Sequence, residues 1–292
     1  SAPNRYSPLK HPERALKRRG LVLDRMVKLG WLTSEQAEKV KATKLGAVAP
    51  VRHRRAPWAV DAAIDEVEDG LGDGIISSQA VTVGTTIQPG LQLVAEQAVS
   101  LSLRRLTKHF PKTEGTQMAL VAVRAADGAI VAMVGGGDYG TSGFNRATEA
   151  RRQVGSTIKA LTWLFAHEDD PSLAPSTPIP DQPYEVQVGD DIWAPKNYDG
   201  EYLGVVSMQD ALAHSRNVPA VLLAERIGLS RVQAGLKGLG LKGATPFPSV
   251  ALGAFDATPV ELAGAFTVFP GRGQATRPFL IRSVRLPDGR EG

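Results

Sequence analysis

The 292-residue sequence predicts an α+β protein rather than an alternating β-α-β protein. Two short apolar segments, residues 118–123 and 130–134, flank Asp127-Gly128, and this arrangement is a strong hairpin signal. Helical patterns dominate the chain after this hairpin. Because 42% of the residues are hydrophobic, the chain can bury a sizeable core, and its length suggests one to three domains.

The N-terminal 45 residues predict two helices joined by a short turn. Residues 12–29 begin with Pro12, which suits the first helical position, and Gly30 is a plausible C-terminal cap. Thr33 to Gln36 reads as a capping box that opens a second helix reaching about residue 43. Helix pairs of this kind occur in every helical bundle, so they do not by themselves indicate DNA binding.

The middle of the chain changes character several times. Residues 45–80 are rich in Pro, Gly and charge and predict a linker or small connecting module. Residues 81–87 predict a strand, residues 88–90 a turn and residues 91–106 an amphipathic helix. The rest predicts a buried helix at 156–167, a loop at 171–200, and helices near 207–214, 218–227, 230–239 and 258–268.

Charge and composition exclude some functions. Residues 1–60 hold 14 Lys or Arg and 4 Asp or Glu, which leaves −6 on the remainder of a chain carrying +4. The favoured interpretation of this basic segment is a solvated helical face, with a membrane surface and nucleic acid as alternatives. The chain has no cysteine, so disulfides, thiolate metal sites and a cysteine nucleophile are excluded. Its histidines show no metal-ligand spacing, and no apolar run approaches the ~18 residues of a membrane span.

The strongest chemical pattern is Ser156-Thr157-Ile158-Lys159, which opens the apolar helix. One helical turn separates the two polar residues, so the Lys159 amine is expected beside the Ser156 hydroxyl. A serine becomes a nucleophile when a neighbouring base removes its proton, and lysine serves as that base only when neutral. Lowering a lysine pKa from about 10.4 to 7–8 costs about 4 kcal/mol, which burial can supply. The alternative is an ordinary N-cap serine with a surface lysine, since Ser7 to Lys10 has the same pattern in a Pro-rich turn.

A second pattern, Ser215-Arg216-Asn217, lies between two predicted helices, 59 residues after Ser156. A hydroxyl and a carboxamide two residues apart at such a turn can point into one cleft. Taken alone, the segment is also typical of a polar interhelix turn. Gly135 to Gly140 fits G-x-G-x-x-G, but a nucleotide fingerprint requires a following helix, so we expect a glycine turn there.

These motifs together resemble the class A, bifunctional penicillin-binding proteins, which combine a peptidoglycan glycosyltransferase with a D,D-transpeptidase. Residues 145–159 are similar to the active-site segment of that family, and Ser215-Arg216-Asn217 is similar to its second motif. Residues 120–136, 195–200, 211–221 and 258–263 also resemble family segments, and residues 2–15 resemble the end of the glycosyltransferase domain.

The resemblance implies a β-lactamase/transpeptidase-like fold, an antiparallel sheet with helices on both sides. It implies C-terminal glycosyltransferase helices at 1–45, a linker region at 46–114 and an incomplete transpeptidase domain at 115–292. Ser156 would be the acylated nucleophile, Lys159 its proton acceptor and Ser215 the relay to the leaving group. Asn217 would bind the substrate amide, and the Ser156 backbone N–H would be one oxyanion donor. No metal would be needed for acyl transfer, although a divalent metal is possible for the glycosyltransferase part.

The implied partners are peptidoglycan stem peptides ending in D-Ala-D-Ala and β-lactam antibiotics, with no nucleic acid. The implied location is the extracytoplasmic face of the bacterial membrane (the periplasm), through an N-terminal anchor outside this chain. The sequence departs from the family where Val154 and Ala160 replace usual prolines, and no Lys-Thr-Gly motif follows Asn217. We therefore expect weak or no activity from the isolated chain. A serine β-lactamase or penicillin sensor of the same fold, and a non-catalytic cell-wall scaffold module, are the alternatives.

Overall fold

The computed structural model describes residues 6–8, 11–46, 55–72, 75–78, 80–287 and 289. The chain divides into two compact units, and each is described by itself. The first unit contains Ser1–Leu120, Ile130–Ala147 and Phe279–Gly292, and the second contains Val121–Ala129 and Thr148–Pro278. Helices and antiparallel strand pairs occur in both, as the α+β prediction requires. In the first unit the elements are α1 (Pro12–Lys28), α2 (Ser34–Lys41), α3 (Pro57–Leu71), α4 (Ile75–Ser78), β1 (Thr82–Thr85), α5 (Pro89–His109), η1 (Pro111–Thr113), β3 (Ile130–Val134) and β10 (Ile281–Arg285).

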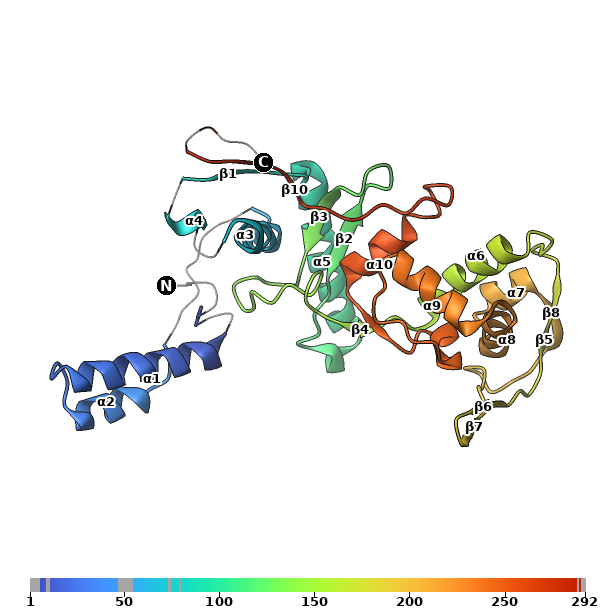
Figure 1. Ribbon diagram of the computed structural model, residues 1–292, viewed down its shortest axis with the longest axis horizontal. Coiled ribbons are helices and arrows are strands. Elements are labelled where there is room, and N and C mark those ends of the chain that lie inside the picture. The colour runs from blue at the N-terminus through green and yellow to red at the C-terminus, as the bar shows by residue number, and fades with distance from the viewer. Residues whose placement is uncertain are drawn as a thin grey trace. The chain divides into compact units, whose positions relative to one another are not determined.

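Helices α1 and α2 form the predicted helix pair and lie side by side (Figure 1). The capping box is present, since the Thr33 side chain accepts from the Gln36 backbone N–H and the Gln36 side chain accepts from Thr33. Gly30 has the positive φ, +72°, expected just beyond a helix C-terminus. Local signals therefore set both ends of the turn between these helices.

Helix α3 lies in the segment that the sequence predicts to be a linker. Its buried positions include Trp58, Ala59, Ala63 and Val67, which form a helical stripe. Two acidic residues of this helix, Asp61 and Glu68, are also buried, so the charged composition of the segment does not reveal the stripe. Asp61 accepts a hydrogen bond from the Tyr139 hydroxyl. The sequence pattern predicts a linker or small connecting module here without indicating a helix, so α3 is an element that it did not reveal.

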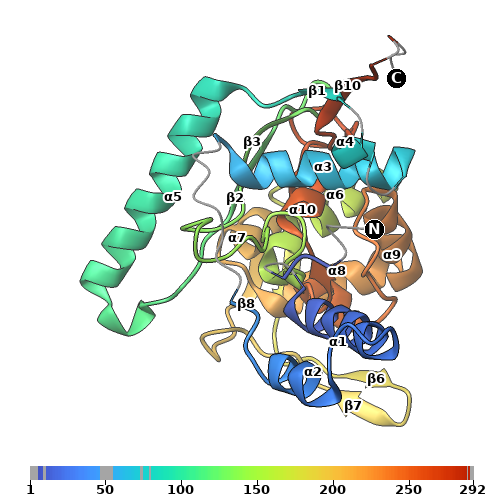
Figure 2. The same ribbon diagram turned by 90° about the vertical axis from the view of Figure 1, so that its left-hand side faces the viewer.

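Helix α5 lies along β3 (Figure 1 and Figure 2). The Gln92 side chain joins them, because it accepts from the Met133 N–H and donates to the Met133 carbonyl. The helix begins at Pro89 and not after residue 90, because proline at the first helical position lacks only a hydrogen that would have no partner. Strand β1 pairs with β10, some 200 positions later in the sequence.

The glycine segment after β3 is a turn without a following helix, as expected. A Cβ at Gly135 would lie 2.4 Å from the Asn145 side-chain oxygen and 2.6 Å from the Trp58 ring. The absence of a side chain therefore lets Asn145 and Trp58 pack against this turn. The nucleotide-binding alternative has no support here.

The second unit holds most of the helices predicted after the hairpin. The hairpin turn is closed by the Arg124 N–H, which donates to the Ala129 carbonyl at 2.9 Å, and Gly128 has a φ of +84°. The predicted loop at 171–200 contains three short strands that sequence reasoning missed. The elements are β2 (Leu120–Val123), β4 (Arg152–Gln153), η2 (Gly155–Ile158), α6 (Lys159–Asp169), β5 (Pro178–Asp181), β6 (Val186–Val188), β7 (Asp191–Trp193), β8 (Gly204–Ser207), α7 (Met208–Ala213), α8 (Asn217–Ile227), α9 (Leu229–Gly238), η3 (Pro248–Leu252), β9 (Asp256–Ala257) and α10 (Pro259–Phe266).

The core of the second unit forms around α6 and α8, which contact each other directly and gather with α7 and α9 (Figure 1). Ile158, Leu161 and Phe165 from the α6 segment pack with Val221 and Ala224 of α8. Three antiparallel pairs, β4 with β9, β5 with β8 and β6 with β7, lie in the same unit. The apolar helix predicted at 156–167 is thus the buried helix of this unit.

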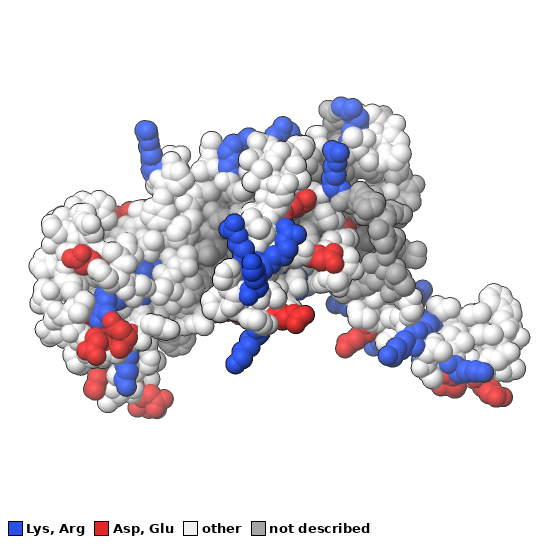
Figure 3. All heavy atoms as spheres, turned by 180° about the vertical axis from the view of Figure 1, so that it is seen from behind, with Lys and Arg blue, Asp and Glu red and all other residues white. Residues whose placement is uncertain are grey.

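Charges on the helix pair α1–α2 are mixed rather than uniformly basic. Lys41 forms ion pairs with Asp24 at 2.6 Å and with Glu38 at 2.7 Å. On the face shown in Figure 3, basic and acidic side chains occur together on this helix pair. These contacts favour the solvated-face interpretation. Within the described residues, no helix is long and apolar enough to span a membrane, and no cluster of three or more His, Asp or Glu could hold a metal ion.

Leu161→Ala tests the assignment of the core. Leu161 is fully buried in the main cluster, so truncation should lower the free energy of unfolding by about 2–5 kcal/mol. Leu203→Ala is the control, because that side chain is 55% exposed and its loss should change stability by less than about 0.5 kcal/mol. Chemical denaturation measures both, and equal effects would contradict the core assignment.

Candidate active site

Ser156 lies in a 3-10 turn, η2, that leads directly into α6 at Lys159. The sequence predicts a regular α-helix from Ser156, so the tighter first turn is a difference. The Lys159 backbone N–H donates to the Ser156 carbonyl, so the 3-10 turn continues into α6 without a break. Ser156 is exposed, whereas Lys159 is 1% exposed. An exposed hydroxyl is thus followed, one turn further along, by a buried amine.

A close backbone contact fixes the turn before Ser156. The Gly155 N–H donates to the Gly253 carbonyl at 3.2 Å, and the Val154 N–H donates to the Phe255 carbonyl at 3.1 Å. Gly155 and Gly253 both have positive φ, and a Cβ on Gly253 would lie 2.1 Å from the Gly155 carbonyl oxygen. Gly253 therefore supports the serine turn from a distant part of the sequence, and no local sequence signal identifies it.

Three of the four predicted site residues, Lys159, Ser215 and Asn217, meet at the Lys159 amine. Its Nζ donates to the Ser215 carbonyl at 2.6 Å, to the Asn217 Oδ1 at 2.6 Å and to the Ser215 hydroxyl at 3.1 Å. None of the described hydrogen bonds joins this amine to the Ser156 hydroxyl. The structure thus brings Lys159, Ser215 and Asn217 into direct contact and places Ser156 in the adjoining turn.

Burial and charge alter the acidity of Lys159. Burial is the larger cause, and the positive charge of Arg216 adds to it, so that the pKa of Lys159 is lowered to about 8. An ammonium has three hydrogens to donate, and three acceptors surround this one. Of the three acceptors only the Ser215 hydroxyl can reverse its hydrogen bond and donate to a neutral amine. The site can therefore accommodate both protonation states by rotating one hydroxyl.

The Ser215–Asn217 segment has an unusual backbone. Ser215 has a φ of +53°, in the left-handed region that costs a non-glycine residue about 1–2 kcal/mol. Two backbone bonds hold it after α7, because the Ser215 N–H donates to Leu212 at 3.0 Å and the Arg216 N–H donates to Ala211 at 2.8 Å. In this conformation both the carbonyl and the hydroxyl of Ser215 reach Lys159.

Asn217 is the first residue of α8, and both its side-chain amide and its backbone N–H are hydrogen-bonded. Its side-chain Nδ2 donates to the Lys196 carbonyl at 2.7 Å, and its backbone N–H donates to the Asn197 Oδ1 at 2.7 Å. The amide orientation is therefore fixed, with oxygen toward Lys159 and nitrogen toward Lys196. One Nδ2 hydrogen remains for another acceptor.

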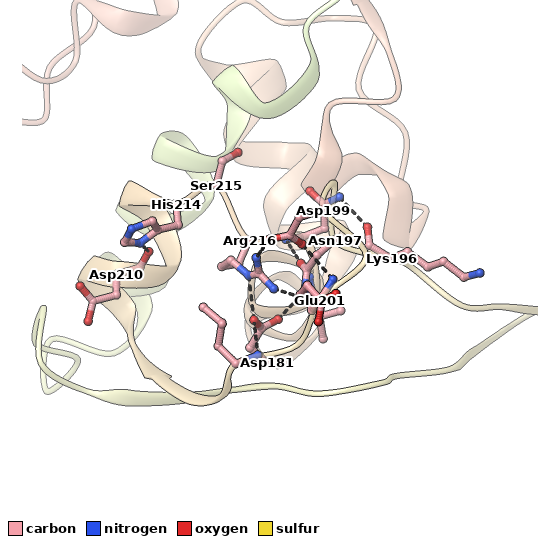
Figure 4. A network of polar contacts seen from close by, with 12 residues as sticks. Asp181, Lys196, Asn197, Asp199, Glu201, Asp210, His214, Ser215 and Arg216 are labelled. Carbon is pink, nitrogen blue, oxygen red and sulfur yellow. Dashed lines mark hydrogen bonds and ion pairs between the residues drawn. The ribbon is translucent and has the colours of Figure 1, made fainter.

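Arg216, which sequence analysis treats only as the middle residue of the motif, is 4% exposed. Its guanidinium donates to Asp181 and Asp199, each at 2.7 Å, and to the Glu201 carbonyl (Figure 4). Figure 4 shows the Arg216 guanidinium directed toward Asp181 and the Ser215 hydroxyl directed away from it. The signal for these residues was limited to the resemblance of residues 195–200 to a family segment, and nothing in the sequence pointed to Asp181.

An exposed serine followed one turn later by a buried lysine is an arrangement suited to serine acyl transfer. The sequence profile of the family described as the penicillin binding protein transpeptidase domain matches residues 118–288. The match covers more than half of the chain, and the chain belongs to this family.

Similar proteins extend the likeness over the remaining residues. Penicillin-binding protein 1B of Vibrio cholerae is 34% identical over 289 residues, covering 97% of this chain and 37% of that protein. Penicillin-Binding Protein 1A from Haemophilus influenzae has a similar solved structure, with a TM-score of 0.69, 23% identity and coverage of 97% of this chain and 56% of that one. PonA1 from Mycobacterium tuberculosis, solved with penicillin V, has a TM-score of 0.64, 21% identity and coverage of 82% and 64%. The chain thus spans little more than a third of the length of the Vibrio cholerae relative.

Titration of the lysines tests the environment of Lys159. In NMR spectra of the lysine side chains, one resonance should titrate near pH 8, well below the ~10.4 of a lysine in water. Lys159→Met should remove that resonance, whereas Lys196→Met, at an exposed site, should leave it unchanged. A spectrum in which every lysine titrates above pH 10 would contradict a buried amine at this position.

Proposed function

We propose that this chain is the acylation centre of a D,D-transpeptidase that cross-links peptidoglycan, with Ser156 as the nucleophile. The observation that carries the proposal is the buried Lys159 amine, held by Ser215 and Asn217 one turn after an exposed serine. A serine needs a neighbouring base, and an amine whose pKa is about 8 is partly neutral near pH 7. The substrate class is a stem peptide ending in D-Ala-D-Ala.

Acylation then follows from these positions. The Ser156 oxygen attacks the carbonyl carbon of the penultimate D-alanine as neutral Lys159 takes its proton. The C–N bond breaks, and the proton passes through Ser215 to the departing D-alanine nitrogen. Asn217 donates its second Nδ2 hydrogen to the substrate amide, and the Ser156 backbone N–H stabilises the oxyanion. An amine of a second stem peptide attacks the ester, which forms the cross-link and frees Ser156.

A β-lactam enters the same chemistry. Attack of Ser156 on the lactam carbonyl opens the ring and leaves an acyl-enzyme, and the ring nitrogen stays attached to the acyl group. This proposal is supported by the family match and by the similar fold of PonA1 from Mycobacterium tuberculosis, which was solved in complex with penicillin V. Acyl transfer of this type needs no metal, because Lys159 accepts the proton. A divalent cation is proposed only for the glycosyltransferase part of the parent protein.

The proposal extends to the parent protein. Residues 1–45 are assigned to the end of a glycosyltransferase domain, 46–114 to a linker region and 115–292 to the transpeptidase domain. Supporting this, the relatives named penicillin-binding protein 1B match 97–98% of the chain, including its first helices. The parent would also polymerise glycan strands and would work at the extracytoplasmic face of the bacterial membrane, held by an anchor outside this chain.

Two alternatives are disfavoured. A serine β-lactamase or penicillin sensor would share the fold, but the chain matches penicillin-binding proteins along almost its whole length. A β-lactamase would turn over a chromogenic β-lactam many times, whereas a transpeptidase would be labelled once per molecule. A non-catalytic scaffold has no use for a lysine that is buried at a cost in free energy.

Ser156→Ala in the full-length protein should abolish covalent labelling by fluorescent penicillin, because the attacking oxygen is lost. Ser7→Ala is a matched control, since Ser7 stands in the second Ser-x-x-Lys sequence of the chain and should label like the wild type. Gel fluorescence and mass spectrometry of the intact protein measure both. Unchanged labelling of Ser156→Ala would defeat the proposed function.

The rate of acylation should rise with pH, because only neutral Lys159 accepts the proton. With a pKa of about 8, the neutral fraction and the rate should grow about 50-fold between pH 6 and pH 8, then level off above pH 9. Lys159→Arg should give a slow reaction without this step, because arginine stays protonated throughout the range. Stopped-flow labelling across pH measures the profile, and a flat wild-type profile would exclude Lys159 as the base.

A further inference from the structure

Asp181, at the end of β5, is a fully buried carboxylate with no part in the chemistry described above. It accepts hydrogen bonds from the Arg216 Nε at 2.7 Å, the Asn197 Nδ2 at 2.7 Å and the Leu203 N–H at 3.2 Å (Figure 4). A buried carboxylate is tolerated when a cation and further donors surround it, as here. Its two side-chain partners both lead to the Ser215–Asn217 segment.

The first connection runs through Asn197. Its Oδ1 accepts the Asn217 N–H at 2.7 Å and the Val218 N–H at 3.4 Å, at the first turn of α8. Its Nδ2 is bound by Asp181 and by the Glu201 carbonyl at 2.9 Å. A flipped amide would place hydrogens against both backbone N–H groups and oxygen against both acceptors. Asp181 therefore fixes the orientation in which Asn197 can hold Asn217.

The second connection runs through Arg216, which lies between Ser215 and Asn217 in sequence. All three of its donor nitrogens are bound, with Asp181 the only fully buried carboxylate among its partners. Because these acceptors fix the Arg216 side chain, they also restrict the backbone on either side of it. The fixed Arg216 side chain thus helps to keep Ser215 in its left-handed conformation, which is unfavourable for a non-glycine residue.

We propose that Asp181 is a positioning residue for acyl transfer, which acts through Asn197 and Arg216 to hold Ser215 and Asn217 around the Lys159 amine. The inference rests on the proposed function and adds to it residues that touch neither substrate nor nucleophile. Asp181 and Asn197 are contributed by the segment 178–203, which the sequence predicted to be mostly loop. This segment therefore supplies the side chains that hold Arg216 and Asn217 in place.

Asp181→Asn in the full-length protein is the direct test. It keeps the shape of the side chain and removes the charge that holds Arg216, so the second-order rate of penicillin acylation should fall about tenfold or more. Asp199→Asn is the matched control. It makes the same chemical change to a carboxylate at the same 2.7 Å from Arg216, but its side chain is 51% exposed, and the rate should fall by less than about threefold.

The pH profile separates positioning from general damage to the fold. Arg216, with its partners Asp181 and Asp199, is the charged group that acts on Lys159, and the other groups around the amine, Ser215 and Asn217, are neutral. Loss of the Asp181 charge makes the surroundings of Lys159 more positive, so the midpoint of the acylation profile should move below about pH 8. A variant that is only less stable would keep the wild-type midpoint while its active fraction declines.

Asn197→Ala provides a second test that leaves the Arg216–Asp181 ion pair intact, should Asp181→Asn fail to fold. It should also lower the acylation rate about tenfold, because Asn217 loses the acceptor for its backbone N–H. If either folded variant acylates within threefold of wild type with an unchanged pH midpoint, the positioning role is wrong. If Ser156→Ala still labels, the proposed function itself fails, and the two failures are therefore distinguishable.

Discussion

The arrangement of the second unit depends on the burial of one amine. Lys159 is 1% exposed, and placing its charge away from water is unfavourable unless hydrogen-bond acceptors replace the solvent. Three acceptors do so: two belong to Ser215 in the turn between α7 and α8, and the third belongs to Asn217, the first residue of α8. The amine therefore fastens α6 to that turn. The same contacts that compensate for burial also place the two motifs within reach of each other.

This constraint gives a physical role to the strained turn around Ser215 and to the charged residues that hold it. Ser215 adopts a left-handed conformation, and Arg216 and Asp181 form a buried ion pair directly beneath it. Buried ion pairs contribute little net stability, because desolvation offsets most of their attraction. Their geometric effect is larger, since the forked guanidinium and the carboxylate allow few arrangements. The network is better understood as a means of fixing the Ser215 backbone than as a source of folding free energy.

The parts of the site that could be predicted from the sequence are those whose residues lie close together along the chain. Ser156 and Lys159 share one helical turn, and Ser215 and Asn217 are two residues apart, so each pair could be found from a short pattern. Most helices were also predictable from apolar periodicity and capping residues. Asp181 and Gly253 could not be found this way, because they meet Arg216 and Gly155 only after the chain has folded. The same limit applies to α3, whose buried Asp61 finds its partner Tyr139 far along the chain, and to the pairing of β1 with β10.

The hydrogen-bond count at Lys159 also constrains the direction of proton movement. As an ammonium the lysine satisfies the Ser215 carbonyl, the Asn217 oxygen and the Ser215 hydroxyl together. As an amine it has two hydrogens, which can stay on the two acceptors at 2.6 Å, and its lone pair is then left to accept a proton from a hydroxyl. Two carbonyl-type oxygens cannot carry a proton onward, but a hydroxyl can accept one and donate another. Among the described acceptors of the amine, Ser215 is consequently the one through which Lys159 can pass a proton without breaking the contacts that keep it buried.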